Sequence, residues 1–339
     1  TGLPQRKLLR RRGSSCPRRT PTQYGDVKQN GFKHDTKNNR VRLSKGANHK
    51  EHPKAWEYIL VEYETRPGIT VENIQQVRSV YDQHKERWEL HLVCKNEIET
   101  PDAPGTETAG IDLGISNFAA VAYSTEDADL YPGNRLKQDG YYFPKEIATC
   151  DDAGGNRATN LQKKWSERRT HFFHSLAKHI VERCVENGVG RINIGDLEGV
   201  REDEDGSSKN WGKHGNLDLH GWAFDRFTSI LEYKAKGEGI KIVEVDEHDT
   251  SKACCVCGRT DENQRVERGL YVCESCDAAF NADVNGAENI CFDLNQSNSE
   301  SAPDLGGDRS TGWLAQPAVY LHDLSHGFSP REQVVDCKP

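Results

Sequence analysis

Methionine is absent from all 339 residues, so the chain has neither an initiator residue nor the usual handful of internal methionines. The sequence begins at Thr1. These two features lead us to expect a fragment, or a remnant reading frame, truncated at its N-terminus.

Long hydrophobic runs are also absent. No apolar stretch approaches the ~20 residues that a transmembrane helix requires, and no segment resembles the apolar region of a signal peptide. Seven of the eleven cysteines are scattered singly, at positions 16, 94, 150, 184, 255, 291 and 337. Scattered single cysteines are typical of a reducing compartment. We therefore predict a cytoplasmic protein with no membrane segment.

Positive charge is scarce after the first 54 residues. Residues 1–54 carry fifteen Lys and Arg against three Asp and Glu, whereas the remaining 285 positions carry 30 and 50. A basic arm of this kind usually contacts phosphate groups, although a solvated tail is the alternative. The acidic remainder argues against a general nucleic-acid surface unless the protein works in concentrated salt, which screens repulsion.

The first third of the chain has few apolar residues until a cluster of β-forming segments. We expect residues 1–54 to lack regular structure for the most part. Strands are predicted at 56–64, 75–81 and 87–94, the last two as an antiparallel hairpin. The acidic segment 95–108, with its Pro and Gly, has the composition of a linker.

Buried strands and amphipathic helices then alternate. Apolar runs predict strands and 3.6-residue periodicity predicts helices. The expected strands are two within 109–124, separated by a Gly-Ile-Ser-Asn turn, and others at 141–143, 191–196 and 240–245. The expected helices lie at 157–187, at 221–236 and from 281 onwards.

Four cysteines occur in two C-x2-C pairs between the last strand and the last helix. They are Cys254 with Cys257 and Cys273 with Cys276. This spacing is that of a zinc ribbon, because two thiolates on one tight turn can bind one edge of a tetrahedral zinc ion. Cys255 also lies in the first pair, but the C-x2-C register favours Cys254. Free cysteines are the alternative interpretation.

Three carboxylates stand at the ends of the predicted core elements. Asp112 lies in the first buried strand, where a carboxylate is costly to bury unless a cation meets it, and Gly110 and Gly114 nearby are expected to let a ligand approach the backbone. A structural Asp bonded to turn amides is the alternative. Glu198 follows the fourth strand, at the edge where α/β sheets place ligands. Asp283 falls in the first turn of the last helix.

The order of these elements is that of a ribonuclease-H-like fold. Carboxylate oxygens suit Mg²⁺ or Mn²⁺ rather than zinc. Two such ions about 4 Å apart activate a water and stabilise the leaving oxygen of a phosphodiester. The sequence therefore predicts a metal-dependent nuclease with a zinc ribbon inserted before its last helix.

At this point the chain resembles the TnpB (OrfB) proteins of insertion sequences, relatives of the type V CRISPR effectors with a RuvC-like nuclease. The resemblance covers about residues 25–292. It rests on five motifs in order, GIDLGISNFAAV, INIGDLEGVR, WAFDRFTSILEYKA, TSKACCVCG and FNADVNGAENI.

The resemblance implies an RNA-guided DNA endonuclease. A guide RNA derived from the element's end pairs with target DNA, the protein recognises a short flanking motif, and the RuvC-like site cuts. Asp112, Glu198 and Asp283 would be the catalytic, magnesium-binding carboxylates, and the four paired cysteines would hold structural zinc. We expect a monomer in the complex with RNA.

The resemblance also divides the chain into segments. These are a basic, mostly flexible arm (1–54), a partial, wedge-like β-barrel module with its linker (55–105), the two parts of the RuvC-like nuclease (106–249 and 281–295), the zinc ribbon (250–280) and a flexible C-terminal tail (296–339). Family members look longer at the front, so we expect only the later strands of their β module here.

Two other functions remain open. One is a truncated, cleavage-inactive nucleic-acid binder that keeps its three acids. The other is a DDE-type transposase that joins DNA ends, a class that shares the fold and a carboxylate triad but lacks a zinc ribbon in this place.

Overall fold

The computed structural model resolves the chain into two compact units, residues 1–99 with 152–156 and residues 100–151 with 157–339. The residues it describes are 24–28, 31–44, 58–65, 67, 70–82, 87–95, 99–152, 154–195, 224–245, 250–261, 264–267, 269–292, 312 and 314–331.

The first unit contains two antiparallel three-stranded sheets, with strand orders β1-β5-β6 and β2-β3-β4. Val41 and Leu43 of β3 pack with Ile74 and Val77 of β5, so the two sheets share one small core. The strands are β1 (Tyr24–Lys28), β2 (Phe32–Asp35), β3 (Arg40–Ser44), β4 (Tyr58–Glu62), β5 (Ile74–Asp82) and β6 (Arg87–Cys94).

The predicted strands β4, β5 and β6 are confirmed, whereas β1, β2 and β3 were missed. Strand β3 shows why, because only Val41 and Leu43 of its five residues are buried and the other three are charged or polar. Such a short alternation has little weight in a basic, polar segment. The expectation that only the later strands of the β module are present is therefore wrong.

The second unit is organised around a seven-stranded mixed sheet in the order β11-β10-β7-β8-β9-β15-β16. Strands β11, β10 and β7 are parallel, β8 is antiparallel to β7 and β9, and β15 is parallel to β9. The strands are β7 (Glu107–Asp112), β8 (Asn117–Tyr123), β9 (Asp127–Pro132), β10 (Val189–Gly195), β11 (Lys241–Val245), β15 (Ala318–Asp323) and β16 (Gly327–Pro330).

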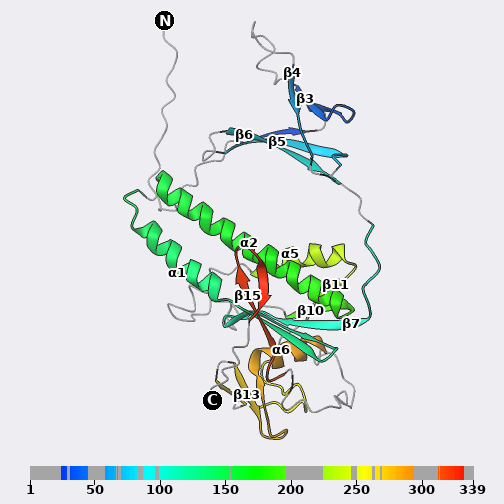
Figure 1. Ribbon diagram of the computed structural model, residues 1–339, viewed down its shortest axis with the longest axis vertical. Coiled ribbons are helices and arrows are strands. Elements are labelled where there is room, and N and C mark those ends of the chain that lie inside the picture. The colour runs from blue at the N-terminus through cyan, green and yellow to red at the C-terminus, as the bar shows by residue number, and fades with distance from the viewer. Residues whose placement is uncertain are drawn as a thin grey trace, which may run out of the picture. The chain divides into compact units, whose positions relative to one another are not determined.

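Helices cover both faces of this sheet, as Figure 1 shows. Residues of β8 alternate between the faces. Ala119, Val121 and Tyr123 join the core beneath α2 and α5, whereas Ala120 and Ala122 join the core beneath α6. The helices are α1 (Asn134–Ala148), α2 (Asn156–Glu186), α5 (Phe224–Gly237) and α6 (Ala282–Cys291).

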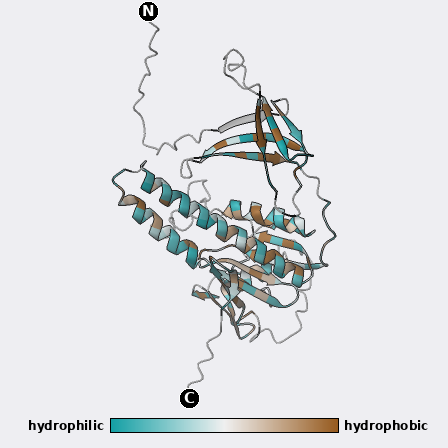
Figure 2. Ribbon diagram, turned by 45° about the horizontal axis from the view of Figure 1, so that its top comes forward, coloured by the Kyte–Doolittle hydropathy of each residue, from teal (hydrophilic) through white to brown (hydrophobic). Residues whose placement is uncertain are grey.

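The long helix α2 confirms the amphipathic pattern over its C-terminal half. Its buried residues there recur at three- and four-residue spacing from Phe172 to Cys184, and hydrophobic and hydrophilic bands alternate along the helix in Figure 2. Before Phe172 only Ala158 is buried. The N-terminal half of α2 therefore presents mostly polar side chains.

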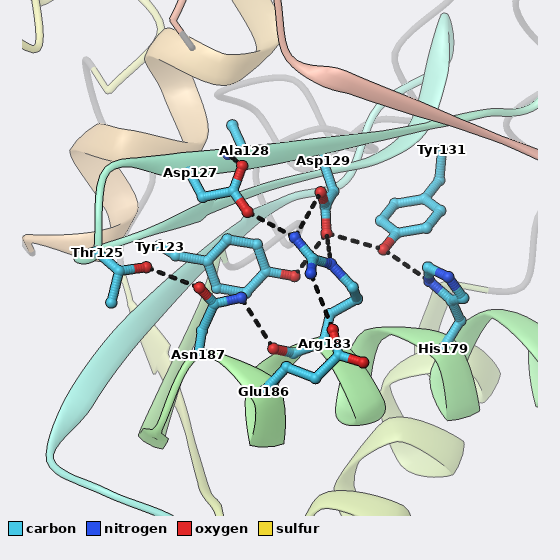
Figure 3. A network of polar contacts seen from close by, with 10 residues as sticks. All are labelled: Tyr123, Thr125, Asp127, Ala128, Asp129, Tyr131, His179, Arg183, Glu186 and Asn187. Atoms are coloured by element: carbon cyan, nitrogen blue, oxygen red, sulfur yellow. Dashed lines mark hydrogen bonds and ion pairs between the residues drawn. The ribbon is translucent and has the colours of Figure 1, made fainter. Parts of the chain in front are cut away.

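A buried ion pair fixes α2 to the sheet (Figure 3). Arg183 Nε lies 3.0 Å from Oδ2 of Asp129, a β9 carboxylate with no exposed surface. The same oxygen accepts hydrogen bonds from the hydroxyls of Tyr123 and Tyr131, at 2.9 and 3.3 Å. Burial raises the pKa of Asp129, and its bonds to Arg183 oppose the rise. Strand β9 can therefore carry an acid because α2 supplies the cation.

Two predictions about this sheet are wrong. Residues 141–143 are not the third strand but part of α1, where Tyr141 and Tyr142 are exposed and only Phe143 is buried. The third strand is β9, whose two acids are matched by Arg183. The segment 296–339, expected to be a flexible tail, contributes β15 and β16.

Strand β15 joins the sheet through aromatic contacts as well as backbone pairing. The Tyr320 ring stacks on that of Tyr131, with centroids 5.6 Å apart. Tyr131 also meets Phe328 of β16 edge to face.

Among the helices that the structure describes, none combines the length and apolarity of a membrane span.

Candidate functional site

The four paired cysteines converge. Their sulfur atoms all lie within 4.8 Å of one another. The Sγ–Sγ separation is 3.8 Å for Cys254 and Cys276 and 3.6 Å for Cys257 and Cys273. Thiolates at about 2.3 Å from a tetrahedral zinc ion are roughly 3.8 Å apart, so the set fits zinc. The four cysteines that converge are the four that the C-x2-C spacing predicted, and Cys255 is not among them.

Both C-x2-C turns end in a residue with a left-handed backbone conformation. The residue after the second cysteine is left-handed in each, Gly258 with φ +70° and Asp277 with φ +50°. In the first turn the amide of Gly258 donates to the carbonyl of Cys254 at 2.8 Å. Glycine adopts this conformation without steric cost, and Asp tolerates it better than most residues. The short sheet of β12 (Arg265–Glu267), β13 (Leu270–Cys273) and β14 (Ala278–Asn281) completes this segment.

Two asparagines of α6 attach the cysteine segment to the helix. Asn285 Oδ1 accepts from the amide of Cys255, and its Nδ2 donates to the carbonyl of Ala253. Asn289 Nδ2 donates to the carbonyls of Thr250 and Ala253, at 2.6 and 2.8 Å. Both asparagines are buried. The cysteine turns and α6 are therefore one hydrogen-bonded body.

Helix α6 also lies directly on the sheet. A Cβ at Gly110 of β7 would overlap the backbone of Ala287 and Cys291, so only glycine fits there. Asn193 of β10 donates to the carbonyls of Ile290 and Cys291, both at 3.0 Å. The approach to Gly110 is therefore made by α6 and not by a ligand, which corrects our expectation for this glycine.

Asp283 is held from three sides at the start of α6. Asn281 caps the helix, its Oδ1 accepting from the amides of Asp283 and Val284. Asn117, the first residue of β8, donates from Nδ2 to Asp283 Oδ2 at 2.8 Å. Arg265 of β12 lies 3.2 Å from the other oxygen. The Asp283 side chain is only 13% exposed, so its orientation is fixed.

Asp112 ends β7 next to this group. A Cβ at Gly286 of α6 would lie 2.7 Å from Asp112 Oδ2, so the helix can pass the carboxylate only because it has glycine there. Burial, and then the negative charge of Asp283, raise the pKa of Asp112 to about 7, and Arg265 opposes the rise. The two acids are therefore close enough to repel each other.

Glu198, the third predicted carboxylate, lies outside the described residues. The strand before it is described, however, and β10 runs parallel to β7 with Ile194 opposite Ile111. Parallel strands end at the same edge of a sheet. Strand β10 ends at Gly195, three positions before Glu198.

The structure thus brings together Asp112 and Asp283, and it adds two residues that sequence analysis missed. Asn117 and Arg265 both contact Asp283 but come from different segments. Asn117 is in a motif that we singled out, without a role of its own. Nothing in the sequence marks Arg265, because its contact depends on the fold of the cysteine segment.

Comparison with known proteins gives two family matches. The OrfB_IS605 family, described as a probable transposase, matches residues 91–201, and the Cas12f1-like TNB domain matches residues 224–290. The first range includes Asp112 and Glu198, and the second includes the four cysteines and Asp283.

Individual relatives agree with these matches. TnpB-like protein ORF457 of Acidianus two-tailed virus is 28% identical, over 62% of this chain and 51% of its own length. The CRISPR-associated endodeoxyribonuclease Cas12f1 of Sulfoacidibacillus thermotolerans is 25% identical, over 63% and 52%. A cryo-EM structure of a Cas12f1–sgRNA–target DNA complex is 20% identical, covering 64% and 45%, with a TM-score of 0.45. The chain spans about half the length of these relatives.

Proposed function

We propose that this chain is an RNA-guided DNA endonuclease of the TnpB family, which its family matches and relatives support, and that its active site is built on Asp112, Asp283 and Glu198. The observation that carries the proposal is the meeting of two carboxylates from separate elements, one raising the pKa of the other. Its partners are a guide RNA and a target DNA.

The strand arrangement supports a ribonuclease-H-like, RuvC-like nuclease. In the order β11-β10-β7-β8-β9, the first three strands are parallel and β8 reverses direction. Asp112 then ends the central strand, and its parallel neighbour β10, the strand that precedes Glu198 in the sequence, ends at the same edge. Helix α6 crosses the other face and brings Asp283 to that edge.

The donor set suits a hard divalent cation. Asp112 and Asp283 offer carboxylate oxygens, which Mg²⁺ and Mn²⁺ prefer, and a cation there would relieve the repulsion that raises the pKa of Asp112. When bound, such ions lower the pKa of an attacking water and stabilise the leaving oxygen.

The surrounding residues orient these acids. Asn117 fixes one oxygen of Asp283, and the Asn281 cap fixes the backbone of its first helical turn. Arg265 is 44% exposed, so it can turn from Asp283 towards the scissile phosphate while its positive charge stays beside the carboxylates.

The cysteine set would bind structural zinc. Four thiolates fill a tetrahedral zinc shell and leave no position for water. The hydrogen bonds of Asn285 and Asn289 join the zinc-binding segment to α6, which carries Asp283. An ordered cysteine segment would therefore hold α6 in place. Arg265 stands on the same ribbon.

The test begins with RNA that co-purifies with the chain. An effector should carry one defined transcript, which can be sequenced. Plasmid DNA complementary to that transcript, flanked by randomised bases, should be cut in Mg²⁺ by the wild-type complex. Asp283→Ala should abolish cutting and leave RNA binding nearly unchanged.

Other outcomes separate the alternatives. A chain that carries no defined RNA and cuts nothing would be a cleavage-inactive remnant. Strand-transfer products, in place of free cut ends, would indicate a DDE-type transposase. Cutting by Asp283→Ala would place the active site elsewhere.

A further inference from the structure

Helices α2 and α5 gather positive side chains where they lie side by side. Arg226 of α5 donates from Nη2 to Oγ1 of Thr170 on α2, at 2.9 Å. One turn further along, the Tyr233 hydroxyl lies 3.1 Å from His174 Nδ1. We name Arg169, His174, Arg226 and Lys234 the α2–α5 basic cluster.

The members of this cluster act on one another as like charges. Burial and then Arg226 lower the pKa of Arg169. Burial, followed by Lys234 and Arg226, lowers the pKa of His174. Lys178 of α2, by contrast, lies 3.1 Å from the carboxylate of Glu182. Gathered cations are unfavourable by themselves but become favourable when an anion binds among them.

This concentration contrasts with the chain as a whole. The net charge is −8, and most of the positive excess lies in residues 1–54. The polar N-terminal half of α2 is visible as the hydrophilic part of that helix in Figure 2. A cluster of positive side chains on a chain of net negative charge would attract a polyanion to this place.

Helix α5 packs against β8, the strand that begins with Asn117. Phe118 of β8 stacks on Phe224, with centroids 5.2 Å apart, and meets Phe227 edge to face at 5.1 Å. Arg226 lies between those two phenylalanines in α5. The residue before Phe118 is Asn117, which binds Asp283. The N-terminal end of α5, which carries Arg226, therefore packs against the residue that follows Asn117 in β8.

An aromatic ring accompanies the cations. Tyr233 is 54% exposed, and Lys234 Nζ lies 5.6 Å from the centre of its ring. Exposed aromatic rings beside a basic track stack on the bases of single-stranded nucleic acid. Paired bases in a duplex are not free to stack in this way.

We propose that the α2–α5 basic cluster binds the backbone of the single DNA strand that reaches the carboxylates, with Tyr233 stacking on one of its bases. This inference rests on the proposed function, since it assigns the strand to be cut. Arg226 and Lys234 contact phosphates, and His174 holds Tyr233 through its hydroxyl.

Fluorescence anisotropy with a short single-stranded DNA of mixed sequence tests the proposal, with the full chain in EDTA so that no cutting occurs. Loss of one phosphate contact weakens binding to a single strand about fivefold at ~0.1 M salt, because the salt slope falls by about 0.7. Arg226→Ala and Lys234→Ala should each show this loss. Lys178→Ala, on the same helix as Arg169 but paired with Glu182, is the matched control and should bind as wild type.

The aromatic contact has its own variants. Tyr233→Ala should weaken binding about fivefold or more without changing the salt slope. Tyr233→Leu keeps an apolar side chain but has no ring, so it should show the same loss of affinity. Equal thermal midpoints for all variants would confirm that they are folded.

Three results would overturn the inference. Arg226→Ala could bind as wild type, Lys178→Ala could lose as much affinity as Arg226→Ala, or the losses could occur with RNA of the same sequence and not with DNA. The last result would assign the cluster to the guide RNA. None of these results would contradict the proposed function, which is tested separately by DNA cutting in Mg²⁺. Conversely, a chain that never cuts but shows these losses would contradict the proposed function alone.

Discussion

Asp112 should make the metal-free protein less stable as the pH rises. Its pKa is about 7 in the folded protein, against 3.8 for an ordinary Asp. Between pH 3.8 and about pH 7, Asp112 is therefore protonated in the folded protein but ionised in the unfolded chain. Stability is unaffected below the unfolded pKa, falls as the pH rises from about 4 to 7, and stays at the lower level above 7.

The size of the effect follows from the shift. Three pKa units correspond to about 4 kcal/mol, at 1.36 kcal/mol per unit. Asp112→Asn removes the charge and keeps the shape of the side chain. In EDTA at pH 8 the variant should therefore have a free energy of unfolding about 4 kcal/mol above that of wild type, and at pH 4 the two should differ little.

Urea unfolding from pH 4 to pH 8 in EDTA measures this difference. Asp102→Asn, at an exposed position in the same unit, is the matched control and should follow wild type. Millimolar Mg²⁺ should raise the stability of wild type at pH 8 and leave Asp112→Asn unchanged. Parallel pH profiles for wild type and Asp112→Asn would refute the reasoning, because they would mean that Asp112 is not destabilised by burial and Asp283.

Two further predictions concern the metal set and the buried ion pair. Cys273→Ser should lose zinc, disorder residues 250–290 and abolish cutting, as measured by zinc content and proteolysis. Cys184→Ser, at a buried cysteine outside the set, should keep its zinc, and full activity of a zinc-free chain would contradict a structural role. Asp129→Asn should cost about 3–5 kcal/mol of unfolding free energy, because it removes the fully buried carboxylate from Arg183 and leaves it only the more exposed Asp127 and Glu186. Glu186→Gln, at the exposed end of the same network, should cost less than about 1 kcal/mol, and equal losses in urea unfolding would show that burial does not set the cost.

Local patterns predicted the elements that carry the site. The spacing of the cysteines determines their convergence, since each C-x2-C turn is a short-range structure. Strand β10 and helices α2 and α5 were predicted because their apolar periodicity is strong. The position of Asp283 in the first turn of α6 also followed from the sequence, in which the helix was expected to begin at 281.

Features that depend on distant partners were not predictable. Strand β9 contains Asp127 and Asp129, and the cation that pairs with both, Arg183, comes from the distant helix α2. Gly110 was assigned to ligand access, but its real neighbour is the backbone of α6, which lies far along the chain. The same is true of β15, whose Tyr320 needs Tyr131 as a partner.

The most direct measurement of the central claim is the binding of Mn²⁺, followed by electron paramagnetic resonance of the free ion at pH 8. Wild type should remove free Mn²⁺ from solution, and Asp112→Asn and Asp283→Asn should each weaken binding at least roughly tenfold, because both carboxylates hold the same ion. Binding by either variant with wild-type affinity would contradict a shared metal site.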